Sequence, residues 1–347
     1  MSQLFFLSLL NPKFSIIIPL YNSSLTIKDC LDAVLNLDYS KEDYDVTVVD
    51  DASTDNSAEI ASGFPFRLIK SGSNNGPAAA RNIGAKQAKG DFLFFLDADV
   101  VLPKNCLKLA EDCLKEKNRK VFFASFSRQM RYQNASSQYK NLYLCYYYLK
   151  QKERTHTLDT SFAFVSRDLF EEVKGFDVMP KKFGEDIDLG MRLTKMGHHI
   201  EINKEIEAEH LKKYNFKKLM KTDYRRGKEI SRLFLKNFFK KEKKEKSFFS
   251  MRPLNIYFNM PISFLISALA IATIISYKIF IFPLVLVISF FVGINCGFWF
   301  YLFKANGFFF LLKALFITFA DSLAMGLGTA VSLFAVLKEK VIVKRYE

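Results

Sequence analysis

The chain has 347 residues, half of them apolar, and a formal net charge of +14 at pH 7. This length allows one large domain or two ordinary ones, with a sizeable core. The five cysteines form no CxxC pair, which argues against zinc and disulfide frameworks and predicts a reduced, cytosolic environment for the soluble part.

The positive charge is concentrated in one segment, residues 236–252, which holds seven Lys or Arg against two Glu. Such a segment predicts an anionic partner, either phospholipid or a phosphorylated substrate. Nucleic acid is a weaker interpretation, because the basic residues lie beside a long apolar stretch instead of alternating with exposed aromatic residues. We therefore expect no nucleic-acid partner.

The first residues, 1–13, contain an apolar stretch that is too short to cross a bilayer, which takes about 20 residues. No basic segment precedes it and no small-residue cleavage site follows, so it is a poor signal peptide. We expect a lead-in that packs on the first strand or touches the membrane surface.

Strands and helices alternate in the next part of the chain, residues 14–235. This alternation predicts an α/β fold with a mostly parallel sheet flanked by helices. The expected strands are 14–22, 45–51, 66–70 and 91–99, and the expected helices are 26–37 and 81–88.

Polar residues follow the expected strands at the point where each strand ends. In an open parallel sheet, ligands bind beyond the carboxyl ends of the strands. Asp97 and Asp99 are the most notable, since a buried carboxylate is normally solvated, paired or bound to a metal. The others are Tyr21, Asn22, Asp50 and Asp51.

The C-terminal part, residues 253–347, is apolar. The stretches 254–276 and 279–303 are each long enough to cross a membrane as a helix, and a third, 307–337, contains Lys313 and Asp321. The basic flanks favour a cytosolic location for both ends, so we expect two spans followed by an interfacial or re-entrant helix. Two buried helices of a soluble core are the alternative.

Four motifs, in order, carry a resemblance to a known family: SIIIPLYN, VVDDASTDNS, NNGPAAARNIGAKQAKGDFLFFLDADV and FGEDIDLGMRL. Together they resemble the inverting nucleotide-sugar glycosyltransferases of family 2, which have the GT-A fold. The resemblance covers about residues 14–230. It implies a GT-A domain over 14–235, joined by the basic juxtamembrane segment to transmembrane helices, as in membrane-anchored members.

The pair Asp97 and Asp99 matches the DxD motif of that family. A divalent cation, Mg²⁺ or Mn²⁺, would stabilise the departing diphosphate, and it prefers carboxylate and phosphate oxygens. If extended, the two side chains would point to the same side, about 6 to 7 Å apart. The resemblance implies that Asp99 binds the metal, Asp97 the donor sugar, and His210 completes the metal site; a solvated turn is the alternative.

The resemblance also implies a donor pocket. Asp51 would accept a hydrogen bond from the nucleobase between Pro19 and Tyr21, which favours a UDP-sugar. Arg81 would lie near the diphosphate, because a guanidinium suits phosphate. The alternatives are a turn and helix cap at Asp51 and an exposed helix position for Arg81.

On the acceptor side, the family's ED motif matches Glu185 and Asp186. Inversion in one displacement needs one carboxylate to take the proton of the attacking hydroxyl, and we assign this base to Asp186. A charged helix N-terminus is the alternative. Arg225 and Arg226 would meet the diphosphate or a lipid phosphate, or lie on a basic helix against anionic headgroups.

These expectations describe a multi-pass protein of the cell membrane with a cytosolic catalytic domain. It would move a sugar from a nucleotide-sugar donor to a lipid-linked or cell-surface glycan, with membrane lipids as further partners. A polyprenyl phosphate as the direct acceptor and a non-catalytic nucleotide-sugar-binding membrane protein are the alternatives. A nucleotidyltransferase would carry a Gly-rich loop after its first strand, where this chain has PLYNSSLT.

Overall fold

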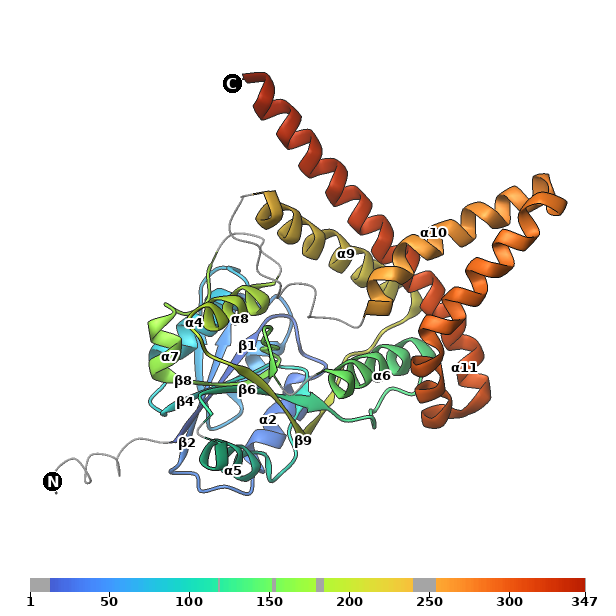
Figure 1. Cartoon of the computed structure of the whole chain (residues 1–347). Helices are drawn as coiled ribbons and strands as arrows, with labels where there is room; N and C mark the ends of the chain where they lie inside the picture. The colour runs from blue at the N-terminus through green and yellow to red at the C-terminus, as the bar shows by residue number, and fades with distance from the viewer. Residues whose placement is uncertain (1–12, 118, 152–153, 179–183, 240–253, 347) are drawn as a thin grey trace. The chain divides into compact units, whose positions relative to one another are not determined.

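The computed structural model describes residues 13–117, 119–151, 154–178, 184–239 and 254–346. It divides into two compact units (Figure 1). The sheet unit comprises Met1–Arg131 and Gln151–Lys212, and the helical unit comprises Tyr132–Lys150 and Lys213–Glu347. The expected lead-in, 1–13, lies outside the described residues except for Lys13, as does most of the basic segment 236–252.

The sheet unit contains a mixed, mostly parallel sheet in the order β3-β2-β1-β4-β8-β6-β9-β5, with β7 beside β9. β1 pairs in parallel with β2 and β4, β2 with β3, and β6 with β9, whereas β8 runs antiparallel to β4 and β6. The strands are β1 Phe14–Leu20, β2 Tyr44–Asp50, β3 Arg67–Lys70, β4 Phe92–Leu96, β5 Val100–Val101, β6 Val121–Phe126, β7 Arg154–Thr155, β8 Phe162–Ser166 and β9 Ile200–His210. The α/β fold expected from the sequence is confirmed.

The central strands are mostly apolar and buried because helices cover the sheet. In β6 every residue is buried, as in β8. Phe164 stacks on Phe94 and Phe122 at centroid distances of 4.1 and 4.6 Å. The helices of this unit are α2 Ile27–Leu35, α3 Ser57–Ser62, α4 Pro77–Gln87, α5 Cys106–Lys117, α7 Arg167–Glu172 and α8 Glu185–Lys195.

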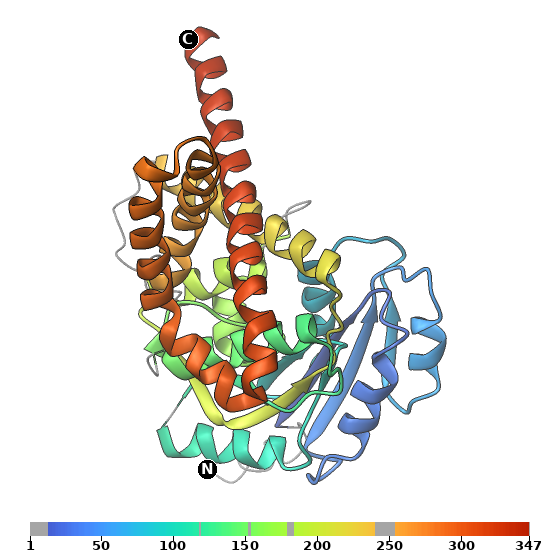
Figure 2. The same ribbon diagram turned by 90° about the vertical axis from the view of Figure 1, so that its right-hand side faces the viewer.

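Parallel pairing brings the carboxyl ends of β1, β2 and β4 to one edge of the sheet, and the strands drawn in blue run side by side in Figure 2. The polar residues that follow these strands therefore share that edge. Helices α4 and α8 lie side by side (Figure 1), joined by an ion pair between Arg81 and Glu185.

The helical unit consists of α6 Ala135–Lys150, α9 Phe216–Phe239, α10 Leu254–Ile275 and α11 Tyr277–Tyr346. α6, α9 and α10 each pack against α11. α11 is broken at Gly307, whose φ of 77° and ψ of −174° are not helical. This break separates the two apolar stretches expected at 279–303 and 307–337.

The division into units differs from the domain boundary expected near residue 235. The final passage from the sheet unit to the helical unit occurs between Lys212 and Lys213. α6 also belongs to the helical unit, although the residues before and after this segment belong to the sheet unit. The reason is burial: Tyr139 and Leu142 of α6, with Leu219 of α9, share an apolar cluster with Phe298 of α11.

Among the described residues, two helices are long and apolar enough to cross a membrane by length and composition. The segments are Phe258–Ile275, with mean hydropathy 2.0, and Tyr277–Lys338, with mean hydropathy 2.5. Of an apolar 18-residue stretch in each segment, only 17% and 11% respectively is buried within the protein. Most of this apolar surface is therefore uncovered.

Candidate active site

Asp51 follows β2 and is buried at the sheet edge. Its Oδ1 accepts hydrogen bonds from the Asn75 amide at 3.0 Å and the Ser71 hydroxyl at 3.1 Å, and its Oδ2 accepts one from the Gly76 amide at 2.7 Å. The carboxylate thus fixes the loop that leads into α4. Because a carboxylate has about four acceptor positions, this turn role leaves room for another donor.

The two residues expected to wall the nucleobase lie at the end of β1. Pro19 is partly buried and pairs in register with Val49 of β2, and Tyr21 is 47% exposed. An exposed aromatic ring at a strand end is available for stacking.

Arg81 of α4 is only 3% exposed, so the alternative of an exposed helix position is wrong. Its guanidinium donates hydrogen bonds to Asp97 Oδ1 at 2.7 Å and Glu185 Oε1 at 3.1 Å, and it lies 5.6 Å from the Phe176 ring. Burial acts to lower the pKa of Arg81, but the Asp97 and Glu185 carboxylates raise it above its ordinary value. Arg81 therefore joins the DxD segment to the ED segment.

The expectation that residues 97–99 are extended is wrong. β4 ends at Leu96 and the next residues form a turn, in which the Val100 amide donates to the Asp97 carbonyl oxygen at 3.1 Å. Because of this turn, the two aspartates have different surroundings: Asp97 contacts Arg81, and Asp99 contacts β9 and the residues after it.

Asp99 and His210 meet because β5 pairs with the end of β9, where Val100 lies opposite His210. Asp99 Oδ1 is 3.5 Å from His210 Nε2, and its Oδ2 is 3.5 Å from Lys212 Nζ. Burial acts to raise the pKa of Asp99, but Lys212 and His210 hold that pKa well below its usual range. Phe126 stacks on the imidazole at 4.6 Å and fixes its orientation.

Two atoms at this point fit a metal. Asp99 Oδ1 and His210 Nε2 are buried and have no hydrogen-bond partner. Within the described ranges, no group of three or more His, Cys, Asp or Glu side chains forms a metal cluster. Two protein ligands nevertheless suit Mg²⁺ or Mn²⁺, which commonly take their other ligands from substrate phosphates and water.

Asp186 lies in the first turn of α8. This helix begins directly after Gly184, which has a left-handed conformation. Asp186 Oδ1 accepts the Ile187 amide at 2.8 Å, so the charged helix N-terminus that we considered is also present. Desolvation, followed by the negative charges of Glu185 and Asp159, raises the pKa of Asp186 to about 7. A carboxyl group with this pKa is suited to accept a proton at neutral pH.

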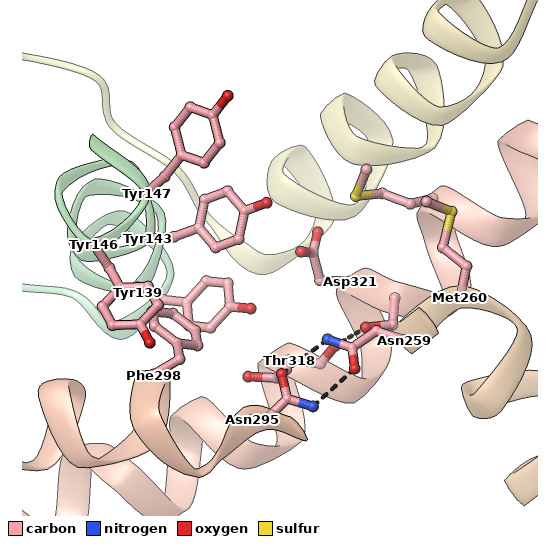
Figure 3. A pocket seen from close by; sticks show the side chains of 12 residues that line it. Tyr139, Tyr143, Tyr146, Tyr147, Asn259, Met260, Asn295, Phe298, Thr318 and Asp321 are labelled. Carbon is pink, nitrogen blue, oxygen red and sulfur yellow. Dashed lines mark hydrogen bonds between the residues drawn. The ribbon is translucent and has the colours of Figure 1, made fainter. Parts of the chain in front are cut away.

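Arg225 and Arg226 belong to α9 in the helical unit. Arg225 is exposed, whereas Arg226 lies 3.6 Å from Asp223, which also pairs with Lys140 at 2.5 Å. The buried Asp321 lines a cavity of this unit with tyrosines of α6 (Figure 3). Arg226 is thus already paired with a buried carboxylate.

Lys212 is a residue of the site that sequence reasoning missed. It follows His210 by two positions, and alternation along an extended chain puts such residues on the same side, which was the available signal. The Arg81 bridge carried no comparable signal, because Arg81 and Glu185 are 104 positions apart.

Residues 15–174 match the sequence model of Glycosyl transferase family 2. Over this stretch the chain is similar to family 2 glycosyltransferases. The match ends before Asp186 and His210, which the fold brings into the same sheet unit as the DxD turn.

Known proteins resemble different parts of the chain. The poly(ribitol-phosphate) beta-glucosyltransferase of Bacillus spizizenii is 40% identical over 93 residues, which cover 25% of this chain and only 15% of that protein. Glycosyltransferase AglE of Haloferax volcanii is 29% identical over 227 residues, covering 62% of this chain and 72% of AglE.

The solved structure of mannosyltransferase PcManGT from Pyrobaculum calidifontis, in complex with GDP-Man and Mn²⁺, has a TM-score of 0.62 at 18% identity. The similarity covers 91% of this chain and 87% of PcManGT. At this level of identity the match establishes a shared fold: a GT-A sheet followed by long C-terminal helices.

Proposed function

We propose that this protein is a membrane-anchored inverting glycosyltransferase that uses a nucleotide-sugar donor, with a UDP-sugar favoured. The observation that carries the proposal is one cluster in the sheet unit. Asp51 and Asp97 follow β2 and β4, which flank β1; Arg81 of α4 pairs with Asp97, and Asp99 lies beside His210 at the end of β9. Donor, metal and base functions each have a residue of suitable chemistry there.

The donor's base would lie between Pro19 and the exposed Tyr21 ring, with a base N–H donating to the free acceptor capacity of Asp51. The donor sugar would meet Asp97, whose position Arg81 holds. The Arg81 guanidinium, close to where the diphosphate would lie, would offset part of its negative charge.

Asp99 and His210 would hold the divalent cation through the two buried atoms that have no other partner. When bound, the cation would act as a Lewis acid toward the leaving diphosphate. Lys212, 3.5 Å from Asp99, would add a second positive charge beside the diphosphate.

Asp186 would take the proton from the attacking acceptor hydroxyl. Its pKa near 7 leaves about half of the molecules ionised at neutral pH, and the developing acid is stable enough to keep the proton. A single base on the acceptor face predicts inversion at the anomeric carbon. Glu185, tied to Arg81, would fix the start of the helix that carries this base.

The apolar helices support membrane anchoring. A core helix of a soluble protein buries most of its residues, whereas α10 and α11 leave most of their apolar surface uncovered within the described chain. An acceptor that is itself held at the membrane, a lipid-linked or cell-surface glycan, suits an enzyme with this anchor. The basic segment 236–252 favours a cytosolic sheet unit.

The test uses the full chain purified in detergent, with a panel of nucleotide-sugars and Mn²⁺. One donor should raise the melting temperature and be hydrolysed slowly to the nucleoside diphosphate. Asp99→Asn should abolish the Mn²⁺-dependent effects, whereas Asp38→Asn, which changes an exposed carboxylate, should retain them. Absence of stabilisation and of hydrolysis with every donor would refute the proposal.

A further inference from the structure

The exposed face of α9 carries a stripe of basic side chains. Lys217, Lys218, Lys221 and Arg225 are exposed, and Lys228 is partly exposed. With about 3.6 residues per turn, these five positions fall within an arc of about 100°. None of the five forms an ion pair with a carboxylate among the residues that the structure describes, and one acid, Glu229, lies at the edge of the arc.

α9 is locked against α11 along the face beside the stripe, where the Lys228 backbone itself contacts α11, so the orientation of the stripe is fixed. A side-chain carbon at Gly227 would lie 2.1 Å from the Met325 carbonyl oxygen, which shows that the two backbones touch. The Ser231 hydroxyl donates to Thr329 Oγ1 at 2.9 Å. Leu219, on the side of α9 away from the stripe, is completely buried.

α11 also presents exposed apolar side chains. Phe309, Phe316 and Phe334 are 80%, 63% and 74% exposed, and Phe216 at the start of α9 stacks on Phe316 at 5.6 Å. A face of this kind is suited to lipid, and aromatic side chains are enriched where a membrane meets water. The helical unit thus combines a lipid-compatible surface with a basic one.

We propose that the α9 stripe, defined as Lys217, Lys218, Lys221, Arg225 and Lys228, binds the headgroups of anionic phospholipids. This inference rests on the proposed membrane attachment but not on the proposed sugar transfer. Ammonium and guanidinium groups attract a phosphate that carries net negative charge, whereas a zwitterionic headgroup has none. From Lys217 to Lys228 the stripe spans about 16 Å, so it covers several headgroups at once.

The stripe should therefore give selectivity among lipids. Each basic residue near an anionic surface contributes about fivefold, so neutralising three should weaken the preference for anionic lipid about 100-fold. The preference should also fall as salt rises from about 0.1 to 1 M, because the Debye length shrinks.

The experiment titrates the detergent-purified full chain with dioleoyl phosphatidylglycerol or dioleoyl phosphatidylcholine and counts bound lipids by native mass spectrometry. Wild-type protein should prefer phosphatidylglycerol, and Lys217→Gln/Lys221→Gln/Arg225→Gln should lose that preference. A matched control, Lys86→Gln/Lys89→Gln/Lys104→Gln, removes three charges from the sheet unit and should bind like wild type.

A charge-preserving variant, Lys217→Arg/Lys221→Arg/Arg225→Lys, should keep the preference, which separates loss of charge from loss of fold. Equal binding of the two lipids by wild type would overturn the proposal, as would retained preference in the neutralised variant. A polyprenyl phosphate that displaces phosphatidylglycerol when present in equal amount would also overturn it, by assigning the stripe to an acceptor lipid.

Discussion

Replacing Arg81 by alanine removes the one guanidinium that joins Asp97 to Glu185. Arg81 is 3% exposed, and the two carboxylates are 24% and 15% exposed in their side chains. After the substitution, the two negative charges would share a partly enclosed space without a counter-charge.

The expected loss can be worked out from this geometry. Breaking a buried ion pair by removing one partner costs about 3 to 5 kcal/mol. Because both carboxylates keep some contact with solvent, we expect the lower end, about 3 kcal/mol. For a unit of this size, that corresponds to a fall in melting temperature of roughly 6 to 12 °C.

The assay is differential scanning calorimetry of the detergent-purified chain, with Arg67→Ala as the control. The Arg67 side chain is exposed on β3 and donates a hydrogen bond to the exposed Gln87 side chain at 3.2 Å, so its replacement should change the free energy of unfolding by less than about 0.5 kcal/mol. Arg81→Lys should recover part of the loss in stability, because a lysine ammonium can pair with one of the two carboxylates but cannot bridge both as the guanidinium does.

A double-mutant cycle of Arg81→Ala with Glu185→Gln should give a coupling energy of about 1 kcal/mol or more. The Arg81→Ala variant should also bind the nucleotide-sugar more weakly, because two uncompensated carboxylates repel the diphosphate. If Arg81→Ala melts within about 1 °C of wild type, the reasoning that this bridge holds the two motifs together is refuted.

Three further predictions concern the base, the helix α8 that carries it, and the metal. The pKa of about 7 at Asp186 predicts that kcat/KM rises with pH up to about 7 and then levels, because only the ionised carboxylate accepts a proton. Asp186→Asn should lower kcat about 10²- to 10⁴-fold and remove that rise. An unchanged pH profile in this variant would exclude Asp186 as the base. Gly190→Ala in α8 puts the new side-chain carbon 2.8 Å from the Leu158 backbone nitrogen, so it should destabilise the protein by about 1 to 3 kcal/mol and reduce turnover. The control is Gly63→Ala, whose new carbon would have its nearest neighbour at 3.4 Å, and it should be nearly neutral in the same thermal melts. EDTA should abolish donor hydrolysis and Mn²⁺ restore it, and His210→Gln should need more Mn²⁺ for half-maximal rate than wild type; equal requirements would remove His210 from the metal site.

Much of the sheet unit could be predicted from local patterns. Apolar runs such as 92–96 form strands because their side chains suit a surface buried on both faces, and the polar residues after them mark the carboxyl edge of the sheet. The ED pair was expected either at a helix start or as a base; Asp186 does lie at a helix start, and its role as a base stays a prediction.

The helical unit was less predictable. The apolar stretches of α10 and α11 are evident from composition, but α6 has the sequence of an ordinary domain helix. Its tyrosines pack against α11, and Lys140 pairs with Asp223 of α9, 83 positions away. That pairing also explains why Arg226, beside Asp223, is not a free cation.

The sequence by itself determined which chemical groups are present at the strand ends and that the C-terminal helices are apolar, because both depend on residues that are neighbours in the chain. Only the tertiary structure decided which groups meet. It showed that Asp97 and Asp99 lie on a turn and face different partners, that Arg81 is buried between two motifs, and that Lys212 joins Asp99. These contacts join residues far apart in the chain, and local periodicity carries no information about them.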